Sequence, residues 1–148
     1  MIKKLLLTLL LLSISLYASE VKWAKDYHEG LKKAKELNKP IMFVSSRHTC
    51  KYCVILDNTT FKNAMITKEL NDNFISIVAY SDEKDYMPQE LWRPGTPAIW
   101  FLNSDGVPMF QPIMGAVGVK DFLNIVPQVK QEFQALQKKE KNDFYKLK

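Results

Sequence analysis

The two cysteines of the chain, Cys50 and Cys53, are separated by only two residues. They follow an apolar run at 41–44 that predicts a buried strand, and a segment with the apolar spacing of a helix comes after them. Cys50 is therefore expected at or near the N-terminus of a helix, where unpaired backbone N–H groups and the helix dipole favour a thiolate over a thiol. A thiolate is a nucleophile at neutral pH, and Cys53 is close enough to form a disulfide with Cys50 after a first attack.

The side chains around the cysteine pair could adjust its chemistry. Lys51 places a cation beside Cys50, and His48 could act as a second cation that lowers the Cys50 pKa. Tyr52 precedes Cys53 and could control access to it. The alternatives are that His48 is an exposed loop histidine and that Tyr52 merely caps the helical turn.

An inert structural disulfide is the simplest alternative to a redox role. A bridge over two intervening residues closes a very small loop, and the entropic stabilisation by a disulfide grows with the length of the loop that it closes. A bridge between Cys50 and Cys53 would therefore stabilise the fold little. The spacing favours a labile, redox-active pair.

Metal binding by the same residues is a second alternative. Zinc takes four ligands, and the other histidine, His28, lies in a separate predicted helix, so we expect no zinc site. Copper(I) accepts fewer and softer ligands, which leaves a copper chaperone that uses Cys50, Cys53 and His48 as an alternative function. For the redox function we expect neither a metal nor a cofactor.

The N-terminus has the pattern of a secretory signal peptide at residues 1–18. Lys3 and Lys4 provide the charged start, residues 5–16 the apolar stretch, and Ala18 a small residue at the cleavage position. This leader predicts export to the periplasm. An uncleaved membrane anchor is the alternative, although the apolar stretch is short for a bilayer span.

The rest of the chain suits one domain, at residues 19–137, followed by a charged tail at 138–148. Of the 148 residues, 47% are hydrophobic, which is enough for a sizeable core. The formal net charge of +5 is mild, and the lysines of the tail are mixed with acidic residues. Nucleic-acid binding needs a clustered basic face, so we expect no nucleic-acid partner.

The apolar periodicities predict an α/β order of elements. Strands are expected at 41–45, 74–80, 98–102 and 107–113, and helices at 20–38, from about Cys50 with a break near 57–60, at 62–71 and at 119–136. The Asp105–Gly106 pair between the last two strands is a hairpin signal, and Pro108 and Pro112 predict an edge or bulged strand after it. This order predicts a small sheet, part parallel and part hairpin, with helices on both faces.

A Gly95-Thr96-Pro97 turn comes directly before the third predicted strand. A strand, a C-x-x-C at a helix start and this Gly-Thr-Pro before a hairpin together resemble the thioredoxin superfamily, over roughly Trp23 to Leu136. The resemblance implies a thioredoxin-like α/β fold, with a central mixed sheet of about four to five strands flanked by helices. It also implies that Pro97 is cis and faces the cysteines, and that the Thr96 backbone pairs with an extended substrate.

Two short motifs, TCKYC at 49–53 and GTPA at 95–98, are most similar to those of the periplasmic disulfide isomerases and reductases. The segment at 23–40 is similar to single-domain, exported thioredoxin-related proteins. This similarity implies two catalytic residues and three substrate-binding residues: Cys50 and Cys53, and Thr96, Pro97 and Tyr52. The known isomerases add a dimerisation domain for which this sequence has no residues, which argues against isomerisation. The segment around Trp23 resembles reducing members, which favours reduction.

One departure from the superfamily concerns proton transfer. Val44 stands six residues before Cys50, where thioredoxin keeps a buried aspartate that relays protons. Proton transfer at Cys53 must therefore use another group, such as water, Lys51 or a carboxylate from residues 81–90.

The sequence thus predicts a periplasmic thiol:disulfide oxidoreductase that reduces protein disulfides, with isomerisation second and oxidation last. Oxidation ranks last because strong oxidants of this superfamily usually have a histidine between the cysteines, where this chain has Lys51 and Tyr52. The expected partners are disulfide-bonded proteins and a membrane or periplasmic thiol that donates electrons, and the chain is expected to be a monomer. A non-catalytic peptide-binding module that keeps only the fold is a further alternative.

Overall fold

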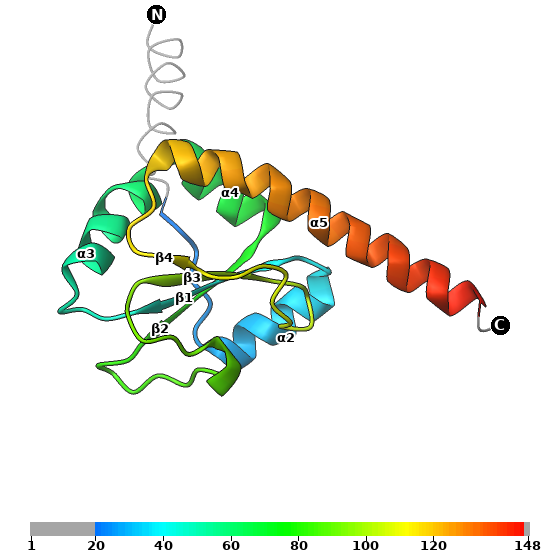
Figure 1. Ribbon diagram of the computed structural model, residues 1–148, viewed down its shortest axis with the longest axis horizontal. Helices are drawn as coiled ribbons and strands as arrows, with labels where there is room; N and C mark the ends of the chain where they lie inside the picture. The colour runs from blue at the N-terminus through cyan, green and yellow to red at the C-terminus, as the bar shows by residue number, and fades with distance from the viewer. Residues whose placement is uncertain (1–19, 147–148) are drawn as a thin grey trace, which may run out of the picture.

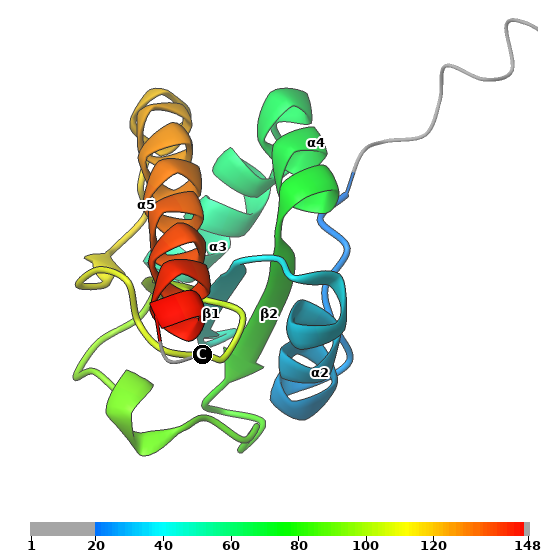
Figure 2. The same cartoon turned by 90° about the vertical axis from the view of Figure 1, so that its right-hand side faces the viewer.

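The computed structural model describes residues 20–146, which form one mixed four-stranded sheet with helices on both faces (Figures 1 and 2). The strand order is β2-β1-β3-β4. β1 pairs in parallel with β2 and antiparallel with β3, and β3 pairs antiparallel with β4. The strands are β1 (Ile41–Ser46), β2 (Ile75–Tyr80), β3 (Ala98–Leu102) and β4 (Ile113–Met114). The predicted α/β fold with a mixed sheet is therefore confirmed, while the predicted signal peptide at 1–18 lies outside the described residues.

The central strand β1 is buried along its whole length because each of its faces meets a different group of helices. The α-helices of residues 20–146 are α2 (Tyr27–Leu37), α3 (Lys51–Asn58), α4 (Ala64–Asn73) and α5 (Val119–Lys146). Ile41 and Phe43 point to the face covered by α2, and Met42 and Val44 point to the face covered by α3, α4 and α5. Successive side chains of a strand point to opposite faces, which explains why this strand has no polar alternation.

Helix α2 begins at Tyr27, so the prediction of a helix from residue 20 was wrong at its start. The Asp26 side chain accepts a hydrogen bond from the Glu29 N–H at 2.8 Å and caps the helix there. The residues before the cap run extended along the edge of the sheet, where Trp23 forms a parallel bridge with Ser76. This segment thus covers part of the edge of β2 that no other strand pairs with.

The break predicted near 57–60 is present between α3 and α4. Helix α3 ends at Asn58, and a 3-10 helix at Thr60–Lys62 follows it. The Asn63 side chain then accepts hydrogen bonds from the first turn of α4, which is the pattern of an N-cap. The cysteine-bearing helix is therefore short, and its direction is set independently of α4.

The predicted strand at 107–113 was wrong over most of its length. Only β4 is regular strand, and before it Pro108 makes a single bridge to Leu102. Proline has no N–H to donate to a neighbouring strand, so Pro108 and Pro112 keep this segment from forming a continuous pairing. The hairpin turn itself forms, since the Asn103 carbonyl accepts from the Gly106 N–H at 3.1 Å.

Helix α5 continues to Lys146, well past its predicted end at residue 136. Its first half packs on the sheet through buried apolar side chains, and the side chains from 138 to 146 are exposed. The second half projects beyond the sheet (Figure 1). Among residues 20–146, no helix combines the length and the apolar character needed to cross a bilayer.

Phe122 of α5 anchors that helix to the core, so its removal tests the packing. The side chain is fully buried and makes ring contacts with Phe61 and Phe101. We expect Phe122→Ala to lower the free energy of unfolding by about 3–5 kcal/mol in urea denaturation, because it leaves a cavity in a packed interior. The control is Phe144→Ala on the same helix, where the ring is 58% exposed and the expected change is within about 0.5 kcal/mol. Equal losses in both variants would contradict this packing.

Candidate active site

Cys50 is the N-cap residue of α3, as the sequence predicted. β1 ends at Ser46, and a tight turn in which the Cys50 N–H donates to the Arg47 carbonyl at 3.2 Å leads into the helix. The Cys53 N–H, in the first turn of α3, donates to the Cys50 sulfur at 3.2 Å. The Cys50 sulfur thus occupies the place of an ordinary capping oxygen and receives one of the unpaired N–H groups of the helix end.

The loop before β3 meets the Cys50 sulfur from the other side. The Cys50 S–H donates to the Thr96 carbonyl at 3.3 Å, although the two residues are 46 positions apart in the chain. The Thr96–Pro97 peptide bond is cis, and the Pro97 carbonyl accepts a hydrogen bond from the Gly115 N–H at 2.9 Å. This last bond joins the loop to the segment that follows β4, so two separate parts of the sheet hold the Thr96 backbone beside the sulfur.

Burial and hydrogen bonds together set the pKa of Cys50. Partial burial raises it, but hydrogen bonds from the Cys53 and Thr96 side chains and from the backbone at Cys53 and Tyr52 outweigh the burial and hold the pKa below the ordinary value of a thiol. The thiolate of Cys50 is therefore favoured by the local fold, as expected for a sulfur at a helix N-terminus.

Cys53 has the opposite environment. Its side chain is only 1% exposed, and burial together with the neighbouring Cys50 raises its pKa above the ordinary value. Contacts with Thr96, Ser46 and the Arg47 backbone lower this pKa, but by less. The site thus holds one accessible sulfur that ionises easily and one buried sulfur that stays protonated, both reduced in this structure.

His48 lies against a different group of side chains. Its ring stacks on Tyr80, with centroids 4.0 Å apart, and its Nε2 is 2.7 Å from a carboxylate oxygen of Glu83. Its backbone N–H donates to Asp82 at 2.9 Å. The contacts that lower the Cys50 pKa come from elsewhere, so the structure gives no support to the predicted pKa-tuning role of His48 or of Lys51.

Residues 20–146 contain no cluster of three or more histidine, cysteine, aspartate and glutamate side chains placed to hold a metal ion. The predicted substrate-binding residues lie at or next to the site: Thr96 is beside Cys50, Pro97 follows Thr96 and is buried, and Tyr52 is on the first turn of α3. The Tyr52 side chain is 58% exposed. It is therefore available to a partner that approaches the accessible sulfur.

Asp57 also lies near the site, although the sequence predicted for it only a place in the break of a helix. It lies on α3 one turn after Cys53 and is half-buried. Burial raises the pKa of its carboxyl, and the nearby charges of His48 and Lys62 offset this only in part. The signal that could have found it is its spacing, because residues three and four apart on a helix share a face.

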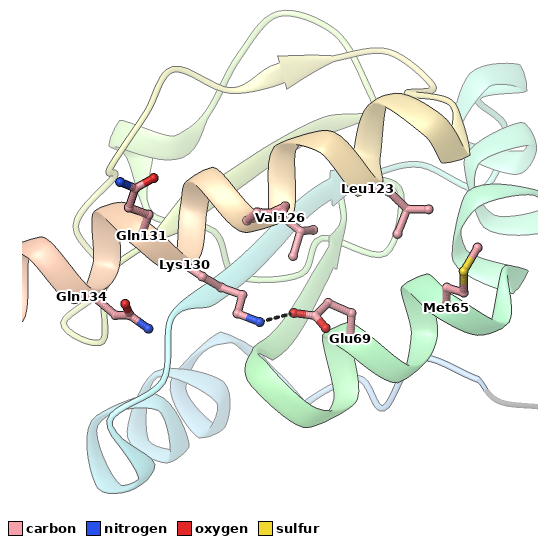
Figure 3. A pocket seen from close by; sticks show the side chains of 8 residues that line it. Met65, Glu69, Leu123, Val126, Lys130, Gln131 and Gln134 are labelled. Carbon is pink, nitrogen blue, oxygen red and sulfur yellow. Dashed lines mark hydrogen bonds and ion pairs between the residues drawn. The ribbon is translucent and has the colours of Figure 1, made fainter.

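A separate groove of about 490 Å³ runs between α4 and α5. Figure 3 shows Lys130 of α5 reaching across it to Glu69 of α4, at 2.6 Å. Leu123, Val126 and Met65 form its apolar part. Neither cysteine nor Thr96 lines this groove, so it is not part of the thiol site.

Comparison with known families matches residues 12–147, nearly the whole chain, to the Thioredox_DsbH model, described as "Protein of unknown function, DUF255". The chain belongs to the Thioredox_DsbH family. Mouse spermatogenesis-associated protein 20 is 34% identical to this Thioredox_DsbH chain over 100 residues, which cover 64% of the chain and 12% of that protein. The matches to the curated relatives span from 9% to 48% of those proteins' own lengths.

Solved structures show the same fold. A thioredoxin from Thermus thermophilus superposes with a TM-score of 0.65 at 22% identity, covering 80% of this chain and 93% of that one. A structure titled "DsbH Oxidoreductase" superposes with a TM-score of 0.57 at 18% identity, covering 81% of this chain and 89% of that one. These similarities establish a thioredoxin-like fold that carries a C-x-x-C pair at the start of a helix.

Proposed function

We propose that this protein is a periplasmic thiol:disulfide oxidoreductase that reduces disulfide bonds in other proteins. The observation that carries the proposal is the asymmetry of the pair: Cys50 is accessible with a lowered pKa, and Cys53 is buried with a raised pKa. Such a pair suits thiol–disulfide exchange, in which one sulfur attacks and the other resolves. The similarity to a structure titled "DsbH Oxidoreductase" supports the same proposal.

The first step is attack by the Cys50 thiolate on one sulfur of a substrate disulfide. A bond forms between the Cys50 sulfur and that sulfur, the substrate S–S bond breaks, and the other substrate sulfur leaves as a thiolate with the electron pair. The hydrogen bond from the Cys53 N–H stabilises the Cys50 thiolate before the attack. The product is a mixed disulfide between Cys50 and the substrate.

The second step returns the substrate in its reduced form. Cys53 loses its proton and attacks the Cys50 sulfur, the mixed disulfide breaks, and the second substrate sulfur leaves as a thiolate. The substrate has gained two electrons, and Cys50 and Cys53 end as a disulfide. A thiol electron donor must then reduce this disulfide before the next cycle.

An extended substrate segment beside the thiol pair is part of the proposal. The Thr96 backbone lies in the loop before β3, next to the accessible sulfur, where main-chain hydrogen bonds to a substrate would add a short strand pairing. Tyr52 contributes exposed aromatic surface on the same helix turn. The signal peptide at 1–18 provides the route to the periplasm.

The first prediction uses the two single-cysteine variants as a matched pair. Cys53→Ser keeps the attacking sulfur but cannot resolve the mixed disulfide. It should therefore accumulate a disulfide-linked adduct with a disulfide-containing protein such as insulin. Cys50→Ser should form none, because the remaining sulfur is buried. Mass spectrometry after acid quenching measures the adduct. An adduct on Cys50→Ser, or none on Cys53→Ser, would contradict the assigned roles.

The direction of electron flow is a separate prediction. We expect the reduction potential of the Cys50–Cys53 pair, measured against glutathione mixtures, to lie near the value of about −270 mV known for thioredoxin. A value near about −120 mV, which is typical of a strong oxidant, would reverse the proposed direction without affecting the exchange chemistry.

A further inference from the structure

The second step of the proposed reaction needs a group that takes the Cys53 proton. Cys53 is buried and its pKa is raised, so the proton does not leave readily to bulk water. The strand beneath the site offers no acid, since the β1 position facing the same layer of helices is Val44. Three acidic residues of the loop after β2 have other partners: Glu83 binds the His48 ring, Asp82 accepts from the His48 backbone N–H, and Asp85 accepts from the Tyr80 backbone N–H.

Asp57 lies on the same helix as Cys53 and on the same face. Residues four apart on an α-helix are neighbours, with Cβ atoms about 5–6 Å apart. The Asp57 carboxyl is half-buried, and no ion pair joins it to any side chain in the part of the chain that the structure describes. The Asp57 carboxyl is therefore partly shielded from solvent and has no direct counter-ion.

A cavity of about 140 Å³ adjoins this carboxyl and could hold water. Asp57 and Tyr80 contribute polar atoms to its lining, together with Lys62 and Glu20, which form an ion pair at 2.7 Å. Trp23 contributes to the apolar remainder. Water in this cavity would have hydrogen-bonding partners on more than one side.

Tyr80 of β2 lines the same cavity as Asp57. Burial raises the pKa of its hydroxyl, and the negative charges of Asp57, Glu83 and Cys53 raise it further, so Tyr80 is within electrostatic reach of both Asp57 and Cys53. The cations facing Asp57 are His48, which stacks on Tyr80, and Lys62. Tyr80 thus lines the cavity beside Asp57, whereas Cys53 does not line it and neighbours Asp57 along the helix.

We propose that Asp57, one helical turn from Cys53, accepts the proton of Cys53 during resolution of the mixed disulfide and passes it on to water in the cavity that it shares with Tyr80. This inference rests on the proposed function. In this step the Cys53 S–H bond breaks and the proton passes to the Asp57 carboxylate. The Cys53 electron pair forms the bond to the Cys50 sulfur, and the substrate sulfur leaves with the electron pair of the broken S–S bond. A carboxylate whose pKa is raised accepts a proton more readily than an exposed one.

The test follows both steps with the reduced full chain and the aromatic disulfide 5,5′-dithiobis(2-nitrobenzoate). Attack by Cys50 releases one coloured thiolate, and resolution by Cys53 releases a second, so stopped-flow absorbance separates the two steps. The leaving thiolate needs no proton, so the second phase reports deprotonation of Cys53. Asp57→Asn is compared with Asp143→Asn, which makes the same charge change at an exposed position near the end of α5.

We expect Asp57→Asn to slow the second phase by at least about tenfold near neutral pH and to leave the first phase unchanged. At high pH, where hydroxide can deprotonate Cys53 directly, the variant and the wild type should converge. Tyr80→Phe should also slow the second phase, and Asp143→Asn should leave it unchanged. Asp57→Asn should fold, because burial already disfavours the carboxylate that it removes.

Two outcomes would overturn the inference: a second phase that Asp57→Asn leaves unchanged, or a slowing that persists equally at all pH values, which would indicate a structural role. Failure of the proposed function looks different, because the wild type would then fail to reduce the disulfides of insulin while still giving both phases with the aromatic disulfide.

Discussion

The hydrogen bond from the Cys53 N–H to the Cys50 sulfur is the contact on which the chemistry of this protein depends. It exists because α3 begins directly after Cys50, which makes the sulfur the cap of the helix. A helix that began one turn earlier would use that N–H within its own backbone and leave the sulfur without a donor. The same geometry separates the two sulfurs by exposure, since the first lies at the helix end and the second lies one turn inside.

The sheet provides the rigidity that this contact needs. β1 is paired on both sides and buried on both faces, so its end at Ser46 fixes where the turn to α3 starts. β3 is the antiparallel neighbour of β1, and the loop that precedes it therefore lies at the same end of the sheet as the cysteines. This arrangement brings the Thr96 carbonyl to the Cys50 sulfur although nothing in the local sequence connects them.

The parts of the structure that could be predicted from the sequence are those set by local patterns. The strand at 98–102 and the position of Cys50 at a helix start follow from apolar runs and from the spacing of the cysteines. The start of α2 could have been found from Asp26, a capping residue followed by Glu29. The contact between His48 and Glu83 could not have been predicted in this way. The two residues are 35 positions apart in the chain, and the parallel pairing of β1 with β2 brings them together.

The most direct test of this account is a pH titration of the thiolate absorbance in the ultraviolet, on the reduced wild type and on His48→Gln. Because the two thiols interact, the wild type should show two steps. The account predicts that the first step lies below the ordinary value for a thiol, disappears in Cys50→Ser and is retained in His48→Gln. Two ionisations at or above the ordinary value, or loss of the early step in His48→Gln, would contradict it.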